Sequence, residues 1–308
     1  MANPMKSLAQ LFGRSQSNII GVIHVGALPG TPRNTKSISE VIDMACEEAE
    51  IYKKAGVDGI IVENMHDVPY LHTKDVGHEI TAFMTAICSR VNQMCSHIPC
   101  GVQILSGANI QAMAVAKATG LQFIRAEGFV FSHVADEGIM DSCAAELLRF
   151  RKNIDADDIK IFTDVKKKHS SHAITADVDI TETAKAAEFF CSDGVIVTGP
   201  ATGTATDIQE MKDVQKAVNV PLLIGSGVTV DNVEHYMSAN GLIVGSHFKD
   251  QGSWKNRVDF TRVRKMVEKV NTMREVGNMN KTQSFMFTRG AFICSYLVEK
   301  TTDHRRQF

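Results

Sequence analysis

Two apolar runs in the last third of the chain each stop at a glycine–serine turn, a pattern that can bind a phosphate group. The runs span residues 221–224 and 241–244, and each predicts a buried parallel strand whose end opens into backbone N–H groups. Glycine lets a ligand approach those N–H groups without obstruction by a side chain. We expect the two turns to hold a phosphate dianion, with close packing at a tight corner as the alternative. The turn residues are Gly225, Ser226, Gly227, Gly245 and Ser246.

A charged segment with three consecutive lysines follows another predicted strand. Because side chains alternate along a strand, Asp164, Lys166 and Lys168 share one face, while Val165 and Lys167 share the other. Val165 belongs against the helices, so we expect Asp164 and Lys168 to point into the site. A lysine there, Lys168 or Lys166, can act as a Schiff-base nucleophile when burial lowers its pKa, or as a fixed cation for an anionic substrate. The alternative is a solvated strand end.

Other predicted strand ends carry further polar side chains. His169 can transfer protons near neutral pH, or it can be an ordinary loop residue. Glu63 ends an otherwise apolar strand, where a carboxylate can act as a general base or hold a metal, and pairing with Arg125 is the alternative. Asn64, Arg125 and Gly199 also stand at strand ends, and we include them among the ligand contacts. The predicted catalytic residues are Lys168, Asp164, Glu63 and His169.

The elements that must position these residues alternate between strand and helix patterns. Apolar runs predict eight strands, at residues 19–25, 59–62, 101–105, 122–126, 159–165, 194–198, 221–225 and 242–245. Helical patterns span residues 39–55, 80–94, 110–119, 141–153, 181–191, 207–218, 231–238 and 259–272. This repeat over about 250 residues matches a single-domain α/β fold, the (β/α)8 TIM barrel, whose functional groups gather at the carboxyl ends of the strands. The rival is a doubly wound open sheet, which usually needs a G-x-G-x-x-G turn that residues 24–30 lack.

Segments at both ends of the chain fall outside the predicted barrel, which we place at residues 18–275. Residues 1–17 form a short N-terminal extension that fits either a weak mitochondrial transit peptide or a disordered start. Residues 276–308 lose the strand–helix periodicity and predict a non-barrel, disordered C-terminal tail, although its apolar clusters at 285–287 and 292–294 can also dock. We expect a cytoplasmic protein, with the mitochondrial matrix as the alternative.

The composition argues against several classes of function. The 308 residues carry a formal net charge of −2 and show no basic face, so we expect no nucleic-acid partner. No apolar run comes near the length of about 20 residues that a bilayer requires. Seven scattered cysteines without a C-x-x-C pair indicate a reducing compartment, and three histidines spaced six residues apart do not fit a metal site. We predict no metal, no cofactor and no membrane partner, and we leave a homo-oligomer open.

Several short stretches, in order along the chain, form a recognisable set. They lie at residues 20–24 with 28–30, 62–64 with 67–69, 135–138, 146–151, 164–165 with 168–169, 198–199 with 202–203, 225–229 and 243–246. With these stretches the chain resembles the BtpA/SgcQ family over residues 18–273, and the tail is not covered. The resemblance implies a TIM barrel related to the ribulose-phosphate-binding barrels. Members of that family are linked to photosystem I biogenesis in cyanobacteria, and others are encoded among bacterial sugar-uptake genes.

The chain departs from the family pattern at the end of the third predicted strand. Gln103 stands where the family usually has Asn, and Ser106 and Gly107 stand where Arg-Asn is frequent. The resemblance therefore implies that a substrate contact at this strand differs in this chain.

Together these observations predict an enzyme that acts on a small phosphorylated metabolite, as a sugar-phosphate aldolase, isomerase or epimerase does. The glycine turns would hold the phosphate, Lys168 would be nucleophile or electrostatic catalyst, and the other three predicted catalytic residues would move protons. A nucleotide or nucleoside substrate presents the same phosphate, so the sequence does not separate it from a sugar phosphate. The alternative from another class is a non-catalytic assembly or stability factor that works through its surface.

Overall fold

Parallel strands close into a barrel in the computed structural model of the chain, which describes residues 4–277. Each strand is a short apolar run that is buried along nearly its whole length, as expected where helices cover the outside. The barrel closes where Ile19 of the first strand pairs with Leu242 of the last. This architecture confirms the predicted (β/α)8 barrel. Its eight strands are β1 (Asn18–His24), β2 (Gly59–Glu63), β3 (Cys100–Gln103), β4 (Phe123–Ala126), β7 (Lys160–Val165), β9 (Gly194–Val197), β10 (Leu222–Ile224) and β11 (Gly241–Val244).

The chain divides into two compact units, Met1–Val267 and Glu268–Phe308, and the barrel lies in the first. In the second unit, residues 268–277 are helical. Apart from residues 276 and 277, the predicted tail lies outside the described residues, and so do its apolar clusters at 285–287 and 292–294.

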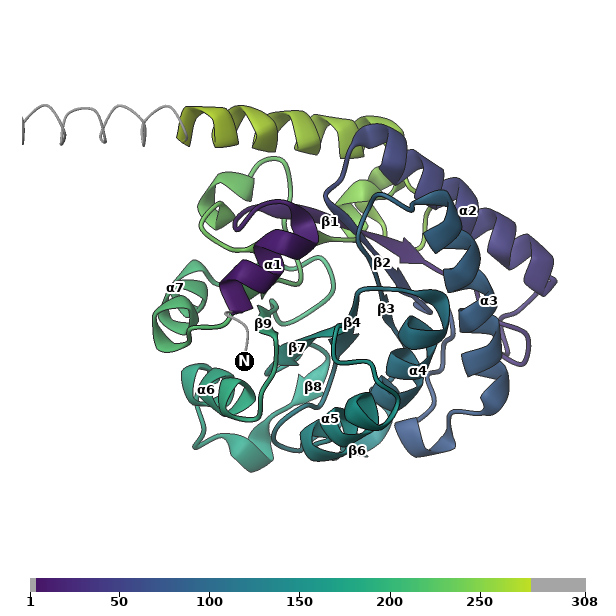
Figure 1. The fold of residues 1–308 in the computed structure, drawn as a ribbon, viewed down its shortest axis with the longest axis horizontal. Coiled ribbons are helices and arrows are strands. Elements are labelled where there is room, and N and C mark those ends of the chain that lie inside the picture. Colours follow the sequence, from purple (N-terminus) through teal and green to yellow (C-terminus); the bar gives the residue numbers. More distant parts are fainter. Residues whose placement is uncertain (1–3, 278–308) are drawn as a thin grey trace, which may run out of the picture. The chain divides into compact units, whose positions relative to one another are not determined.

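Helices on the outside of the barrel connect most of the successive strands (Figure 1). The first of them begins at Ser37, whose hydroxyl and backbone exchange hydrogen bonds with Glu40 in a capping box. None of the described helices is long and apolar enough to cross a membrane. The helices are α2 (Ile38–Ala55), α3 (His78–Met94), α4 (Asn109–Thr119), α5 (Ala144–Asn153), α6 (Ile180–Phe189) and α7 (Ile208–Ala217), and residues 260–267 are also helical.

The connection between β10 and β11 differs from its prediction. A helix over residues 231–238 was expected, but only the 3-10 helix η3 (Val233–Tyr236) forms. The Asn232 side chain bonds the Gly227 carbonyl and the Thr229 N–H group, so the glycine turn takes up the first half of this short connection. Little more than one helical turn then fits before β11. The other 3-10 helices are η1 (Thr73–Asp75), η2 (Ala173–Thr175), η4 (Ser246–Phe248) and η5 (Asp250–Gly252).

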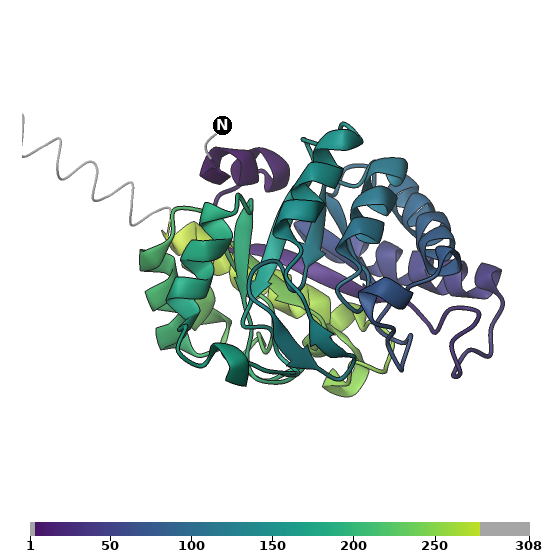
Figure 2. The ribbon, with the colours of Figure 1, turned by 90° about the horizontal axis from the view of Figure 1, so that it is seen from below.

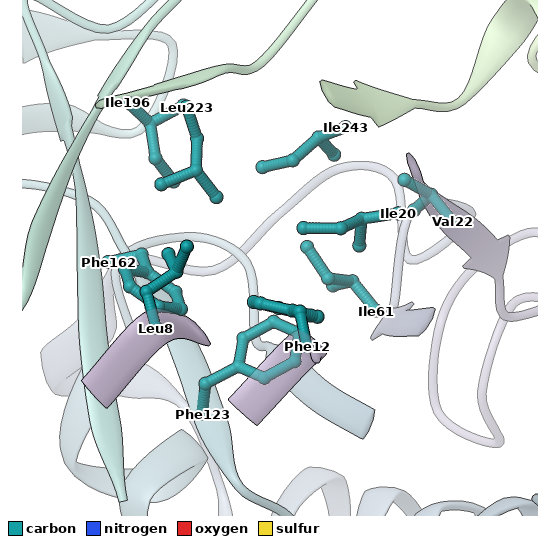
Figure 3. Close-up of a cluster of buried hydrophobic side chains, with 10 residues drawn as sticks. All are labelled: Leu8, Phe12, Ile20, Val22, Ile61, Phe123, Phe162, Ile196, Leu223 and Ile243. Atoms are coloured by element: carbon teal, nitrogen blue, oxygen red, sulfur yellow. The ribbon is translucent and has the colours of Figure 1, made fainter. Parts of the chain in front are cut away.

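The N-terminal extension is part of the barrel core over residues 4–12, where it forms helix α1 (Pro4–Phe12). Its buried residues Leu8 and Phe12 lie among the apolar side chains at the amino-terminal end of the strands (Figure 3). Phe12 meets Phe123 edge to face, with 5.7 Å between the ring centroids. Gly59 leaves room for this ring, since a Cβ atom there would lie 2.7 Å from Phe12 Cε1. Of the two alternatives for the N-terminal extension, the disordered start is therefore wrong for residues 4–12, because their apolar side chains pack against the amino-terminal end of the barrel.

A small antiparallel sheet lies at the opposite end of the barrel, and the sequence did not predict it. Its strands are β5 (His133–Ala135), β6 (Gly138–Met140) and β8 (Ser170–Ser171), in the order β6-β5-β8. They belong to the segments that follow β4 and β7. Figure 2 shows this teal sheet at one end and the purple helix α1 at the other. The carboxyl ends of the barrel strands, where the predicted site lies, are therefore at the end with the small sheet.

Candidate active site at the barrel mouth

One part of the barrel mouth is lined by free backbone N–H groups and a guanidinium group. It is a cavity of about 270 Å³ beside the ends of β10 and β11. The N–H groups of Gly227, Val228, Ser246 and His247 have no hydrogen-bond acceptor among the described residues. Arg262 lines the same cavity, and its Nε donates to the His247 carbonyl at 2.7 Å, which orients the guanidinium. Donors and a cation that converge on one space favour an anion such as phosphate.

All five predicted turn residues line this cavity, but some of their polar groups are bound into the scaffold. The Gly225 N–H group donates to the Val197 carbonyl at 2.8 Å. The Ser226 hydroxyl accepts from the Gly199 N–H group at 2.7 Å and donates to the Thr204 carbonyl at 3.1 Å. Gly199 itself does not line the cavity. The Ser226 hydroxyl and the Gly199 N–H group therefore join the ends of β9 and β10, in place of the phosphate contacts that we predicted.

Arg125 and Asp164 form a buried ion pair at the base of the mouth. Arg125 Nε lies 3.0 Å from Asp164 Oδ1 and Arg125 Nη2 lies 2.9 Å from Asp164 Oδ2, with side chains that are 4% and 1% exposed. Burial alone would lower the pKa of Arg125, but the carboxylate of Asp164 outweighs it and raises that pKa. The alternative pairing of Arg125 with Glu63 is not formed. Asp164, predicted as catalytic, thus orients a cation that lines the mouth.

Glu63 and Lys168 are two charged groups of the mouth that have no bonded partner among the described residues. Both line the 270 Å³ cavity and an adjoining cavity of about 440 Å³. Neither side chain makes a hydrogen bond or an ion pair with any residue that the structure describes. Burial raises the pKa of Glu63, and burial together with the Arg125 cation lowers the pKa of Lys168. Both shifts favour the uncharged forms of the two groups, which are suited to donating and accepting protons.

The lysine run does not follow the predicted alternation. β7 ends at Val165, and Lys166 has a left-handed backbone with φ of 45°, which turns the chain. Lys166 Nζ donates to the Thr175 carbonyl at 3.2 Å and does not line either cavity. Lys167, expected on the helix side, instead lines the larger cavity and pairs with Glu127 at 3.2 Å. Lys167 was therefore misplaced, because alternation holds only while the strand continues.

Two further predicted residues are engaged in loop contacts. His169 Nε2 accepts from the Thr202 N–H group at 3.1 Å and lies 2.8 Å from the Thr202 hydroxyl, at the edge of the larger cavity. Asn64 is buried and lies outside both mouth cavities. Its Oδ1 accepts from the Leu105 N–H group at 2.7 Å, and its amide nitrogen donates to Asp67 at 3.2 Å. The Asn64 amide thus joins the loops after β2 and β3 and is not free for a ligand.

His24, at the end of β1, lines the anion cavity and was not among the predicted site residues. Its Nδ1 lies 2.9 Å from the Trp254 carbonyl. Since a carbonyl only accepts, Nδ1 carries the proton, and the neutral ring keeps an acceptor at Nε2. Burial and the nearby Lys249 cation lower the pKa of His24. A Cβ atom on Gly245 would lie 3.2 Å from Nε2, so the glycine keeps this nitrogen accessible.

Gln103, where the chain departs from the family pattern, lines the larger cavity. Its Oε1 is buried and has no hydrogen-bond partner among the described residues. A buried acceptor of this kind needs a donor, which a bound ligand or water would supply. Among the residues that the structure describes, no group of three or more His, Cys, Asp or Glu side chains could hold a metal ion.

Position could have revealed some of the missed residues. His24 is the last residue but one of the first predicted strand, residues 19–25, so the rule that strand ends carry function points to it. Arg262 follows the last strand by 18 residues, and no local signal distinguishes it from other arginines on a helix.

Three comparisons with known proteins agree with the barrel and with the motifs. The sequence model of the BtpA family matches residues 15–272. An uncharacterised mitochondrial protein of Caenorhabditis elegans is 49% identical over 270 residues, which are 87% of this chain and 98% of that protein. Photosystem I biogenesis protein BtpA of Synechocystis is 32% identical over 263 residues, 85% of this chain and 90% of that protein. The crystal structure of orotidine 5'-monophosphate decarboxylase from Methanocaldococcus jannaschii matches 82% of this chain and 98% of its own with a TM-score of 0.52, and at 12% identity it shows the fold alone.

Proposed function

The chain belongs to the BtpA family, and on that premise we propose that it is an enzyme acting on a small phosphorylated metabolite, as a sugar-phosphate aldolase, isomerase or epimerase does. One observation carries the proposal. The free N–H groups and Arg262 line the same cavity as the unpaired Glu63 and Lys168. A phosphate held at one side of this cavity would place the rest of the substrate against the two groups that can exchange protons.

The anion side would bind the phosphate group mainly through the backbone. Gly227, Val228, Ser246 and His247 would each donate an N–H group, and Arg262 would supply the charge. Gly225, Gly245 and the backbone of Ser226 shape the wall. These groups contact only the phosphate and no other part of the substrate. The anion side would therefore accept any metabolite whose phosphate can reach it while the rest of the molecule fits the mouth.

The reacting side would carry out the chemistry with Lys168 and Glu63. In its amine form, Lys168 can attack a substrate carbonyl carbon; in its ammonium form it can stabilise a developing enolate oxygen. Glu63 can remove a proton from the neighbouring carbon and return it, and a raised pKa suits a group that does both. Arg125, fixed by Asp164, adds a permanent positive charge. His169 stands at the edge of the larger cavity, where its role as a proton carrier stays a prediction.

The fold neighbour supports the class of ligand by analogy. The orotidine 5'-monophosphate decarboxylase named above is by its name an enzyme of a phosphorylated substrate, and it shares the barrel. Fold analogy does not identify a reaction. The identity of the metabolite and the choice among the three reaction types therefore rest on the mouth residues.

Thermal unfolding with a panel of phosphorylated metabolites tests the proposal. A true ligand at 100 times its Kd adds about 2.7 kcal/mol to the free energy of unfolding, which raises Tm by several degrees. Arg262→Ala should remove most of the shift, whereas the exposed Arg149→Ala should keep it. If no compound shifts the Tm of the unaltered protein and Lys168→Ala changes no binding, the proposal is wrong.

The alternative of a non-catalytic assembly factor predicts a different result. The cyanobacterial relative is called a photosystem I biogenesis protein, and a scaffold of that kind would act through its surface. A stable protein partner whose capture survives Lys168→Ala and Arg262→Ala would favour this alternative. A scaffold, however, does not need unpaired charges buried in a barrel mouth, where they cost stability.

The location of the protein also stays a proposal. The name of the nematode relative says mitochondrial, which fits the matrix alternative. Imaging of the full chain with a C-terminal label would distinguish the matrix from the cytoplasm.

A further inference from the structure

A separate cavity of about 230 Å³ opens beside the mouth, between the loop after β1, the middle of α2 and residues 254–257. We call it the rim pocket. His24 lies between the two spaces, since it lines both the anion cavity and the rim pocket. The cationic and aromatic side chains that line the rim pocket, besides His24, are Arg33, Lys36, His66, Trp254, Lys255 and Arg257.

The rim pocket carries an excess of positive charge. Arg33, Lys36 and Lys255 make no ion pair with a carboxylate among the described residues. Arg257 pairs with Glu47 at 2.7 Å. Three cations without carboxylate partners around one concavity produce a field that attracts an anion.

The single carboxylate in the lining of the rim pocket does not offset this charge. Glu48 Oε2 accepts from Lys249 Nζ at 2.7 Å, and its Oε1 accepts from the Val258 N–H group at 3.2 Å. Lys249 is fully buried, and its ammonium group neutralises the Glu48 charge. The three exposed cations are therefore the electrostatic face that a ligand would meet.

Aromatic rings form the wall of the rim pocket next to the mouth. Trp254 and His66 have ring centroids 5.2 Å apart at 38°, and Trp254 and His24 are 6.4 Å apart at 72°. Trp254 is partly exposed, and Lys255 Nζ lies 5.7 Å from the centre of its ring. A partly exposed indole beside cations offers a planar ligand a stacking surface and a charged anchor together.

We propose that the rim pocket binds an anionic ligand that carries an aromatic ring, of the nucleoside monophosphate class. The ring stacks on Trp254, and Arg33, Lys36 and Lys255 hold the phosphate. This site is distinct from the Arg262 cavity, and it does not depend on the reaction proposed for the mouth. A ligand bound here lies against the ring of His24, which also lines the anion cavity.

Tryptophan fluorescence tests this site directly, because Trp254 is the one tryptophan of the chain. Titration of the full chain with adenosine monophosphate should quench the emission in a saturable way. Ribose 5-phosphate, which lacks the ring, should bind at least about tenfold more weakly in calorimetry. An equal affinity of the two compounds would contradict the stacking contact with Trp254.

Variants separate the rim pocket from the mouth. The double variant Arg33→Ala/Lys36→Ala should weaken the quenching by adenosine monophosphate at least about tenfold. The double variant Arg149→Ala/Lys212→Ala, which removes the same charge from exposed helix positions, should leave it unchanged. Absence of saturable quenching, or full quenching in Arg33→Ala/Lys36→Ala, would overturn the proposal.

Arg262→Ala distinguishes the failure of one site from the failure of the other. This variant should keep the quenching by adenosine monophosphate while it loses the Tm shift of mouth ligands. Loss of quenching in Arg262→Ala would overturn the rim pocket, because it would place the nucleotide in the mouth instead.

Discussion

The Arg125–Asp164 pair should show a large coupling energy in a double-mutant cycle. The two hydrogen bonds, at 3.0 and 2.9 Å, are bidentate, and both side chains are almost fully buried. Asp164→Ala leaves the guanidinium without a partner in the protein interior, which costs about 3–5 kcal/mol. Arg125→Met removes the buried positive charge, so the further loss of Asp164 no longer leaves an unpaired cation and costs less free energy of unfolding. The double variant should therefore be at least about 2 kcal/mol more stable than the sum of the single effects predicts.

Urea unfolding followed by far-UV circular dichroism measures the four free energies of unfolding that the cycle needs. A matched control is the exposed pair of Lys152 and Asp157, whose N–O distance of 2.7 Å is just as short but whose side chains are 72% and 58% exposed. That pair should couple by about 0–1 kcal/mol. Additive effects of Arg125→Met and Asp164→Ala, within about 0.5 kcal/mol, would refute the view that Asp164 serves to fix Arg125.

Three further predictions follow from burial and charge. Phe12→Ala should lower the free energy of unfolding by about 3–5 kcal/mol, while the 82% exposed Phe189→Ala should change it by less than about 0.5 kcal/mol, both measured in urea. Burial raises the pKa of Glu63, so the folded protein loses stability as pH rises from 4.5 through that raised pKa. The Tm of Glu63→Gln should therefore exceed that of the unaltered protein at about pH 8 and equal it at about pH 4. Burial lowers the pKa of His133 to about 4, so the unfolded chain binds a proton at higher pH than the folded protein does, and stability should fall as pH drops from 6.5 toward 4. In His133→Gln the Tm should depend less steeply on pH between 6.5 and 4. An unchanged slope of Tm against pH would contradict the lowered pKa of His133.

The barrel could be predicted because each of its strands is recognisable from its own local sequence. Each is an apolar run between polar segments, and each run ends within about two residues of the predicted position. The order of strands around the barrel follows from right-handed strand–helix–strand connections, which are nearly universal. The glycine turns could be assigned to β10 and β11 for the same reason, and the position of the anion cavity followed from that assignment.

Side-chain roles at the mouth could be predicted only in part. Glu63 and Lys168 lie where strand-end reasoning placed them. The position of Lys167 depends on the left-handed turn at Lys166, which no residue pattern in the run indicates. Whether Asp164 is free or bound depends on Arg125, which lies on another strand 39 residues away. Pairing of this kind is decided by barrel closure, so one strand read alone cannot reveal it.

Two elements could not be predicted from the sequence, helix α1 and the small antiparallel sheet. In α1 the spacing of its apolar residues was visible, but nothing local indicated that the floor of the barrel needed a cover. The strands of the small sheet are two or three residues long, below the length at which alternation is detectable.

Helix α1 limits how the protein can be shortened or processed. The family match begins at residue 15, so a protein trimmed to the matched residues would begin after Phe12 and lose α1. The rings of Phe123 and Phe162 would then face water at the bottom of the barrel, as part of a contiguous apolar patch that favours association between molecules. A purification tag is therefore best joined upstream of Pro4, and a processing protease must cut before that residue if the barrel is to remain sealed.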